Sequence, residues 1–294
     1  MASLLRMQVE CIAPSIEDEV APPTADFYQR ALRVMSEARV PFLVGGAFAH
    51  ARFTGIRRAT KDLDLFIQRR DYERVAGLMA SQGWRAELVY PHWLAKVYDG
   101  EDFIDLIFNT GNGVFPVDDH WFEDNTPAEV LGVPVHLANP EDSLLSKAFI
   151  MERERFDGAD IAHLLQCNAE KLDWDGLLRR FGRHWRVLLA HLTLFGYVYP
   201  GERHRVPHWV LEELTARLQR ETGEPPLLDA RICAGTLLSR EQYLHDVEQL
   251  GYVDGRLTPA SHMSPRDVAT WTGAIEQRRA ADDEPQDPVP PPVR

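Results

Sequence analysis

Two aspartates separated by one residue, Asp62 and Asp64, are the clearest candidates for chemistry in the sequence. They alternate with Leu63 and Leu65, so on a β-strand both carboxylates project from one face while both leucines project from the other. The rise per residue of a strand places the two carboxylates about 7 Å apart. At that separation they can share divalent cations, so the pattern predicts a strand with a cation site on its polar face.

A glycine pair, Gly45 and Gly46, follows the short apolar run 41–44 and precedes the segment 47–52, which has the composition of a helix start. Because glycine has no side chain, backbone N–H groups next to it can approach an anion closely. The N-terminus of a helix also favours negative charge. The pair is therefore a candidate phosphate site, and together with the aspartates it indicates phosphoryl or nucleotidyl chemistry.

A third carboxylate, Asp105, lies in an otherwise apolar run between Ile104 and Leu106. Burying an unpaired charge is costly, so we expect Asp105 to be paired, metal-bound or at a cleft. The alternative is a strand end where Asp105 faces water or an arginine. Beside Asp62 and Asp64, it would complete a site for two cations, the arrangement that clamps an in-line phosphoryl displacement.

The formal net charge of −13 argues against a general nucleic-acid coat, because neutralising phosphates requires clustered lysine and arginine. A local basic patch is nevertheless compatible with the sequence. Six basic residues lie near the paired aspartates along the chain: Arg52, Arg57, Arg58, Lys61, Arg69 and Arg70. Their position beside a candidate anion site favours phosphate binding over a merely solvated surface.

The composition is that of a globular protein rather than a membrane or secreted one. Hydrophobic residues at 45% and charged residues at 26% are ordinary for a globular protein, and no apolar run approaches the roughly 20 residues that cross a bilayer. Residues 1–10 lack the apolar core of a signal peptide. Cys11, Cys167 and Cys233 form neither a disulfide framework nor a metal-ligand spacing. We therefore expect a cytoplasmic protein with no membrane partner.

The elements that must position these residues follow from hydrophobic periodicity. Helices alternate with short strands up to about residue 138, whereas the region after Pro140 has the pattern of successive helices. The predicted fold class is α+β, a mixed-sheet domain followed by a mainly helical region. The predicted organisation is an extension at 1–24, an α/β domain at 25–138, a helical domain at 139–222, a helical C-terminal region at 223–280 and a disordered tail at 281–294.

Individual elements are predicted within these regions. Expected strands are 41–44, 62–67, 85–90, 93–98 and 103–108, and expected helices include 25–38, 141–154, 157–166, 173–181, 185–195 and 209–220. Ser239 is predicted to open a further helix through a capping box. Ser264 opens another, with proline at the first helical position.

Other polar residues lack the spacing that chemistry requires. His163, His184 and His191 lie on predicted helices without a paired ligand spacing, and we expect them to be at the surface or hydrogen-bonded in the core. Ser143 and Ser146 lack the context of a nucleophile elbow.

The motifs resemble the nucleotidyltransferase superfamily of the polymerase-β type. The resemblance rests on the glycine pair, the basic approach 54–61, the Asp-Leu-Asp-Leu strand and a later strand with one aspartate. The runs 139–147 and 155–161 are similar to the AbiEii-like and MenT-like bacterial branch, in which a lysine helix precedes an Arg-Asp-x-x-Asp helix. The resemblance covers roughly residues 26–170, and Gly-Gly replaces the more frequent Gly-Ser of that superfamily.

The resemblance implies a role for each motif residue. The implied ligands of two Mg²⁺ ions are Asp62, Asp64 and Asp105. Asp105 would hold the catalytic metal or activate the acceptor, and Lys147 is the fourth implied catalytic residue. The implied nucleotide-binding residues are Gly45, Gly46, Thr60, Lys61, Lys147, Asp157 and Asp160. Within that set, Asp157 or Asp160 would orient the lysine.

The implied reaction transfers an NMP from an NTP, with ATP a candidate donor, to a hydroxyl-bearing acceptor. The acceptor is a tRNA, a protein or a small molecule. The acidic net charge favours a small cationic molecule or a protein. The resemblance to the AbiEii-like and MenT-like branch, which is a branch of toxins, favours tRNA. Two alternatives are a catalytically degenerate protein that binds a nucleotide or a partner, and the toxin of a toxin–antitoxin pair, whose partner would be an antitoxin protein.

Overall fold

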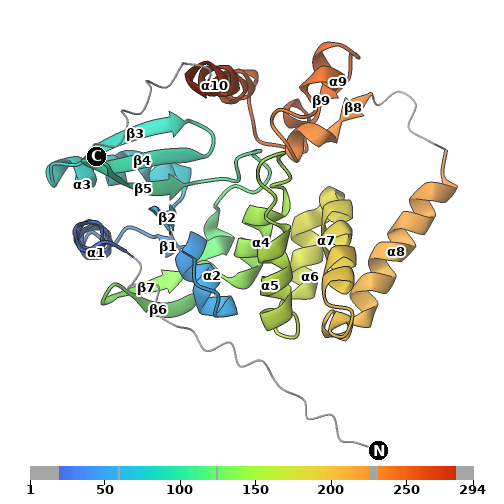
Figure 1. The fold of residues 1–294 in the computed structure, drawn as a ribbon, viewed down its shortest axis with the longest axis horizontal. Coiled ribbons are helices and arrows are strands. Elements are labelled where there is room, and N and C mark those ends of the chain that lie inside the picture. The colour runs from blue at the N-terminus through green and yellow to red at the C-terminus, as the bar shows by residue number, and fades with distance from the viewer. Residues whose placement is uncertain (1–19, 59, 124, 226–230, 283–294) are drawn as a thin grey trace, which may run out of the picture.

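The computed structural model describes residues 20–58, 60–123, 125–225 and 231–282 (Figure 1). Most of the expected disordered tail and most of the expected N-terminal extension lie outside these residues, whereas 281–282, expected to be disordered, are helical. The strands are β1 (Leu43–Val44), β2 (Asp62–Phe66), β3 (Arg85–Tyr90), β4 (Leu94–Asp99), β5 (Asp102–Ile107), β6 (Thr126–Val130), β7 (Val133–Leu137), β8 (Ile232–Cys233) and β9 (Val253–Asp254). The helices are α1 (Pro22–Glu37), α2 (Gly46–Thr54), α3 (Tyr72–Ser81), α4 (Pro140–Ala148), α5 (Gly158–Asn168), α6 (Trp174–Phe181), α7 (Trp185–Val198), α8 (His208–Gly223), α9 (Leu244–Glu248) and α10 (Pro265–Asp282).

Seven strands form one mixed sheet in the order β3-β4-β5-β2-β1-β7-β6. β2 pairs parallel with β5, and β1 pairs parallel with β7, while the other neighbours are antiparallel. The two strands that carry the candidate aspartates, β2 and β5, therefore lie side by side in the middle of the sheet. The α+β fold class predicted from the sequence is confirmed.

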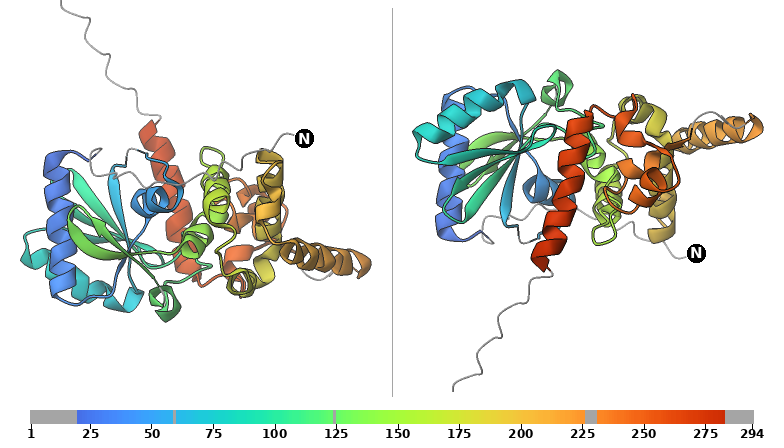
Figure 2. Two further views of the ribbon diagram at one scale, coloured as in Figure 1. Left: turned by 90° about the horizontal axis from the view of Figure 1, so that it is seen from below. Right: turned by 90° about the horizontal axis from the view of Figure 1, so that it is seen from above.

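Helices cover both faces of the sheet. α1 and α3 lie on one face, and α2 lies on the other, between the sheet and the helical region (Figure 2). Leu63 and Leu65 of β2 have no exposed surface and belong to the larger hydrophobic core, which includes Phe27 and Leu32 of α1. The alternation along β2 thus buries its leucines under α1 and turns its aspartates toward α2.

The second half of the described chain is mainly helical. α4, α5, α6, α7 and α8 enclose a second core that includes Leu165, Phe181 and Phe195, and α8 extends away at the far end (Figure 1). α2 packs against α4 and α5, which joins the sheet to the helices. Within the described residues, no helix combines the length and apolar character needed to cross a bilayer.

The predicted helix 141–154 is too long. α4 ends at Ala148, and the chain turns back through a bridge between Met151 and Phe156, after which the N–H of Asp157 donates to the carbonyl of Ile150 at 3.2 Å. The turn returns the chain toward α4, so α5 begins beside the end of the helix that precedes it.

Two expectations for the rest of the chain need adjustment. Ser239 accepts from the N–H groups of Glu241 and Gln242 as a cap would, but regular helix begins only at Leu244. Cys167 is disulfide-bonded, although the sequence predicted no disulfide framework. The cysteine pattern therefore no longer supports the expected cytoplasmic location, which stays a prediction.

The C-terminal segment packs against the loop that follows β5. Ser261 donates from Oγ to the carbonyl of Asn112 at 2.8 Å, and the N–H of His262 donates to the carbonyl of Gly113 at 2.8 Å. α10 begins after Ser264 with Pro265 at its first position, as predicted, and packs against β3. The Ser264 hydroxyl accepts from the N–H of Asp267. The segment that contains Ser261 and His262 thus contacts the loop that follows β5, the strand that carries Asp105.

Candidate active site

The three candidate metal-binding carboxylates lie together. In the register between β2 and β5, Asp64 stands opposite Asp105, and Asp62 lies two residues earlier on the same face. One carboxylate oxygen from each residue lies within 4.8 Å of the others. Because an aspartate at every second position faces the same way, two adjacent parallel strands are sufficient to build this cluster.

The crowding shifts the proton affinity of Asp64. Burial, followed by the charges of Asp62 and Asp105, raises its pKa from 3.8 to about 7. The positive charges of Lys147 and Arg155 act in the opposite direction but do not cancel the shift. Burial and the two neighbouring carboxylates thus disfavour the charged form of Asp64 in the absence of a cation, a condition that favours binding of one.

Asp105 has a cationic partner that the sequence analysis missed. Lys96 of β4 stands directly opposite Asp105 in the β4–β5 register, and its Nζ donates to Oδ1 at 2.6 Å. Burial raises the pKa of Asp105, while the hydrogen bond from Lys96 opposes that shift. The ammonium also lies 3.7 Å from the centroid of the Phe103 ring, so it is held by two groups of the same strand.

Thr60 and Lys61 lie just before β2, but only the Thr60 side chain contacts an aspartate of the cluster. The hydroxyl of Thr60 donates to Oδ1 of Asp62 at 2.8 Å and lies 2.9 Å from the carbonyl oxygen of the same residue. Thr60 thus orients a carboxylate of the cluster. The Lys61 residue is exposed, and its carbonyl accepts from the hydroxyl of Tyr28 at 3.3 Å.

The glycine pair lies against β2. The N–H of Gly45 donates to the carbonyl of Asp64 at 2.9 Å, so this group already has a partner, and a phosphate contact of Gly45 stays a prediction. Gly46 begins α2 with φ of 53°, and a Cβ built there would overlap with the carboxylate of Asp64. A Cβ on Gly45 would overlap with the ring of Phe66. Both positions thus need glycine to let α2 start against the aspartate strand.

Lys147 and the two acids predicted to orient it come together at the junction of α4 and α5. Its ammonium lies 2.8 Å from Oδ2 of Asp160 and 3.3 Å from Oδ2 of Asp157. Arg155 donates two further hydrogen bonds to Asp157, each at 2.9 Å. Asp142, an acid on the same helix as Lys147, is instead paired with Arg180 at 2.7 Å.

These pairs determine the charge of the two acids. Although burial acts to raise the pKa of Asp160, Lys147 and other cations hold it below its ordinary value. The pKa of Asp157 is likewise lowered, because Arg155 and Lys147 outweigh burial. Both acids are therefore ionised at neutral pH, and the lysine that they hold contributes its positive charge to the surroundings of Asp64.

The comparison that decides the family is a sequence match over more than half of the chain. A family model described as "Uncharacterised nucleotidyltransferase" matches residues 30–195, a range that contains all the carboxylates, glycines and basic residues described above. The chain belongs to this nucleotidyltransferase family. No curated protein matches the sequence.

Solved structures share part of the architecture of this nucleotidyltransferase. One is the antibiotic-resistance factor ANT(2'')-Ia, 14% identical, which aligns over 62% of this chain and 96% of its own with a TM-score of 0.37. Another is the lincosamide antibiotic adenylyltransferase LnuA in its lincomycin-bound form, 15% identical, over 49% of this chain and 96% of its own with a TM-score of 0.35. A particular likeness to the AbiEii-like and MenT-like branch stays a prediction.

Two basic residues at the site of this nucleotidyltransferase were not predicted. Lys96 depends on the pairing of β4 with β5, and the sequence analysis did not predict that pairing. Arg155 was noted only as part of a motif. The sequence analysis predicted a continuous helix over 141–154 and therefore did not include the turn that brings Arg155 toward Asp64. An alternation of Lys96 and Tyr98 with apolar residues, facing the same alternation around Asp105, is the signal that could have indicated the first of them.

Proposed function

We propose that this nucleotidyltransferase transfers an NMP from an NTP to a hydroxyl group of an acceptor, with release of pyrophosphate. The observation that carries the proposal is the convergence of Asp62, Asp64 and Asp105 from two adjacent parallel strands, with oxygens within 4.8 Å of one another. The start of α2 lies directly against this cluster at Gly46. A site for cations and a site for phosphate are thereby next to each other.

The carboxylate cluster fits Mg²⁺ by charge and by donor type. Carboxylate oxygens are the protein ligands that Mg²⁺ prefers, and the raised pKa of Asp64 reflects its burial together with the negative charges of Asp62 and Asp105. Asp62, Asp64 and Asp105 would together hold two ions. When bound, such ions neutralise the triphosphate and stabilise the charge that develops at the attacked α-phosphorus.

The chain's own groups supply the remaining functions. The first turn of α2 presents N–H groups that have no acceptor within the helix, and the positive end of its dipole favours phosphate. Lys147 and Arg155 provide fixed positive charge on the side of Asp64 toward α4 and α5. In this proposal, Asp105 accepts the proton of the acceptor hydroxyl, and Lys96 keeps that carboxylate ionised until then.

The acceptor stays open among tRNA, protein and a small cationic molecule. The purified protein is incubated with each α-³²P-labelled NTP, Mg²⁺ and a mixture of tRNA, proteins and aminoglycosides, and the labelled product identifies both donor and acceptor. We expect label transfer with the wild-type protein and none with Asp64→Asn. Nucleotide binding without transfer to any acceptor would favour the degenerate alternative, and specific labelling of tRNA would favour the toxin alternative, which a search for a neighbouring antitoxin gene then tests.

A further inference from the structure

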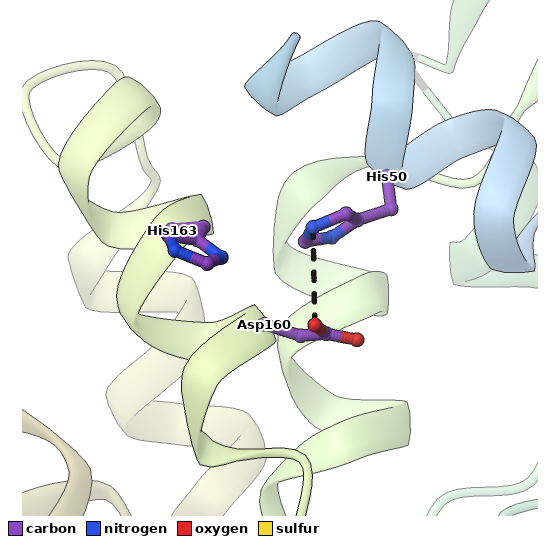
Figure 3. Close-up of side chains that lie close together, drawn as sticks. All are labelled: His50, Asp160 and His163. Atoms are coloured by element: carbon purple, nitrogen blue, oxygen red, sulfur yellow. Dashed lines mark ion pairs between the residues drawn. The ribbon is translucent and has the colours of Figure 1, made fainter. Parts of the chain in front are cut away.

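A second group of potential ligands lies between α2 and α5. His50 comes from α2, while Asp160 and His163 lie one turn apart on α5, and all three side chains point toward a common space (Figure 3). One ligand atom from each lies within 4.8 Å of the others. Nε2 of His50 is 3.9 Å from Oδ1 of Asp160, and the two imidazole rings have centroids 6.4 Å apart.

Polar atoms of this group are buried without hydrogen-bond partners. Within the described part of the chain, both ring nitrogens of His50 and Nδ1 of His163 lack a hydrogen-bond partner. His50 is 3% exposed and Asp160 is 6% exposed. Leaving such atoms unsatisfied is costly, so their arrangement around one space calls for a ligand.

The other helical histidines differ. Nε2 of His191 lies 2.8 Å from the carbonyl of Ala148, and Nε2 of His184 lies 3.2 Å from the carbonyl of Ala260. These two fit the prediction of hydrogen-bonded core residues. His163 does not fit that prediction, and His50 had not been considered, because only the packing of α2 against α5 brings it to Asp160.

Both imidazoles have the protonation state that a metal ligand needs. Burial lowers the pKa of His50 to about 4, although the charge of Asp160 acts in the opposite direction. Burial, supported by the charge of Arg58, also lowers the pKa of His163. At neutral pH each ring is uncharged, so each has a nitrogen lone pair available for coordination.

We propose that His50, Asp160 and His163 bind a divalent transition-metal ion of the zinc class. Two imidazole nitrogens and one carboxylate oxygen suit Zn²⁺ better than Mg²⁺, which prefers oxygen donors throughout. Three protein ligands leave one position of a tetrahedral ion for water or a substrate atom. The site differs in donor type from the carboxylate cluster of Asp62, Asp64 and Asp105, and it does not depend on the proposed transfer reaction.

Asp160 has room for a metal because its two oxygens have different partners. Oδ2 accepts from Lys147 at 2.8 Å, and that contact can persist when a metal is bound. Oδ1 forms an ion pair with Arg58, whose side chain is 46% exposed and can therefore move into water. Arg58 and a metal ion thus compete for Oδ1, so removal of the Arg58 guanidinium should tighten metal binding.

Binding is measured on full-length protein from which metals have been removed, in a background of Asp62→Asn and Asp105→Asn that weakens the carboxylate cluster. Zn²⁺ affinity is read by competition with a chromophoric chelator, and coordination is read from the ¹⁵N shifts of the imidazoles on titration with Zn²⁺. We expect one equivalent of Zn²⁺ to bind and to move the resonances of two histidines. His163→Gln is expected to weaken binding at least about tenfold, because one of the three ligands is lost.

Two matched variants sharpen the test. His136→Gln alters an exposed histidine on β7 and should leave both readouts unchanged. Arg58→Gln removes the competing guanidinium and should tighten Zn²⁺ binding severalfold. The proposal is overturned if the background protein binds no Zn²⁺, if His163→Gln binds as tightly as its parent, or if Arg58→Gln weakens the affinity.

Discussion

The main chain of Gly46 lies so close to the carboxylate of Asp64 that a β-carbon on the glycine would overlap with Oδ2. The same glycine has φ of 53°, a left-handed conformation that side chains disfavour. The residue that begins α2 and the residue at the centre of the acidic cluster therefore constrain each other. A side chain at position 46 would have to displace the carboxylate.

Gly46→Ala is expected to lose cation binding at the carboxylate cluster. The left-handed backbone alone should cost about 1 kcal/mol of stability, and displacement of Asp64 should weaken Mn²⁺ binding, measured by calorimetry, at least about tenfold. Gly132→Ala is the matched control, since Gly132 has φ of 70° and a Cβ there would meet only Gln29 at 3.7 Å. Equal Mn²⁺ affinity in both variants would show that position 46 does not constrain the cluster.

Lys147→Met is expected to reduce both nucleotide transfer and stability. The variant removes a cation from two buried carboxylates, which should cost about 2 kcal/mol, and we expect turnover to fall about 100-fold. Lys147→Arg keeps the charge and should recover part of both. If Lys147→Met lost stability while its turnover, measured well below the melting temperature, stayed near normal, the lysine would be a structural residue only.

Asp64 should make the metal-free protein less stable as the pH rises. Its pKa in the folded protein is about 7, against 3.8 when exposed, so the folded state holds a proton that the unfolded state has lost between these values. The resulting destabilisation is absent below pH 3.8, grows up to pH 7 and is complete above it. Asp64→Asn should therefore raise the melting temperature in chelator more at pH 8 than at pH 5.

The control for this pH dependence is Glu154→Gln, which alters an exposed carboxylate and should leave the melting temperature similar at both pH values. A gain for Asp64→Asn that is the same at pH 5 and pH 8 would contradict a raised pKa. Added Mg²⁺ should reduce the difference between Asp64→Asn and the wild type at pH 8, because the bound cation supplies the missing charge.

Lys96→Met should shift the acidic limb of the pH profile. The Lys96 ammonium opposes the rise in the pKa of Asp105, so its removal should raise that pKa and move the low-pH fall in kcat/KM to higher pH. Lys171→Met alters an exposed lysine in the helical region and should leave the profile unchanged. A profile of Lys96→Met that coincides with the wild type would show that Asp105 does not need to be ionised for turnover.

The sequence predicted the carboxylates better than their surroundings. Asp62, Asp64 and Asp105 stand out because charges within apolar strands need an explanation, and strand periodicity alone puts Asp62 and Asp64 on one face. Lys96 depends on which strands pair, and His50 depends on how two helices pack. The alternation around Lys96 indicates a strand but does not specify its partner strand, and no local spacing places His50 beside Asp160.

For the fold, too, local patterns could be predicted from the sequence, whereas the arrangement of elements could not. Long periodic elements such as α1 and α7 were predicted close to their observed bounds, because each buries a stripe of apolar residues. The helix predicted at 141–154 was wrong, since its pattern continued past a turn that is fixed by Met151 and Phe156. The place of β1 between β2 and β7 could not be predicted, because two residues, Leu43 and Val44, carry too little pattern to choose neighbours.

The central position of β1 has a consequence for synthesis on the ribosome. Both of its neighbours are translated later, β2 within about twenty residues and β7 only at Val133–Leu137. A nascent chain that ends before β7 has one edge of β1 open, with unpaired backbone groups that can recruit other strands. Because α4 and α5 follow β7, the acidic strands emerge well before Lys147 and Asp160, so the assembled centre can form only after more than half of the polypeptide has left the ribosome.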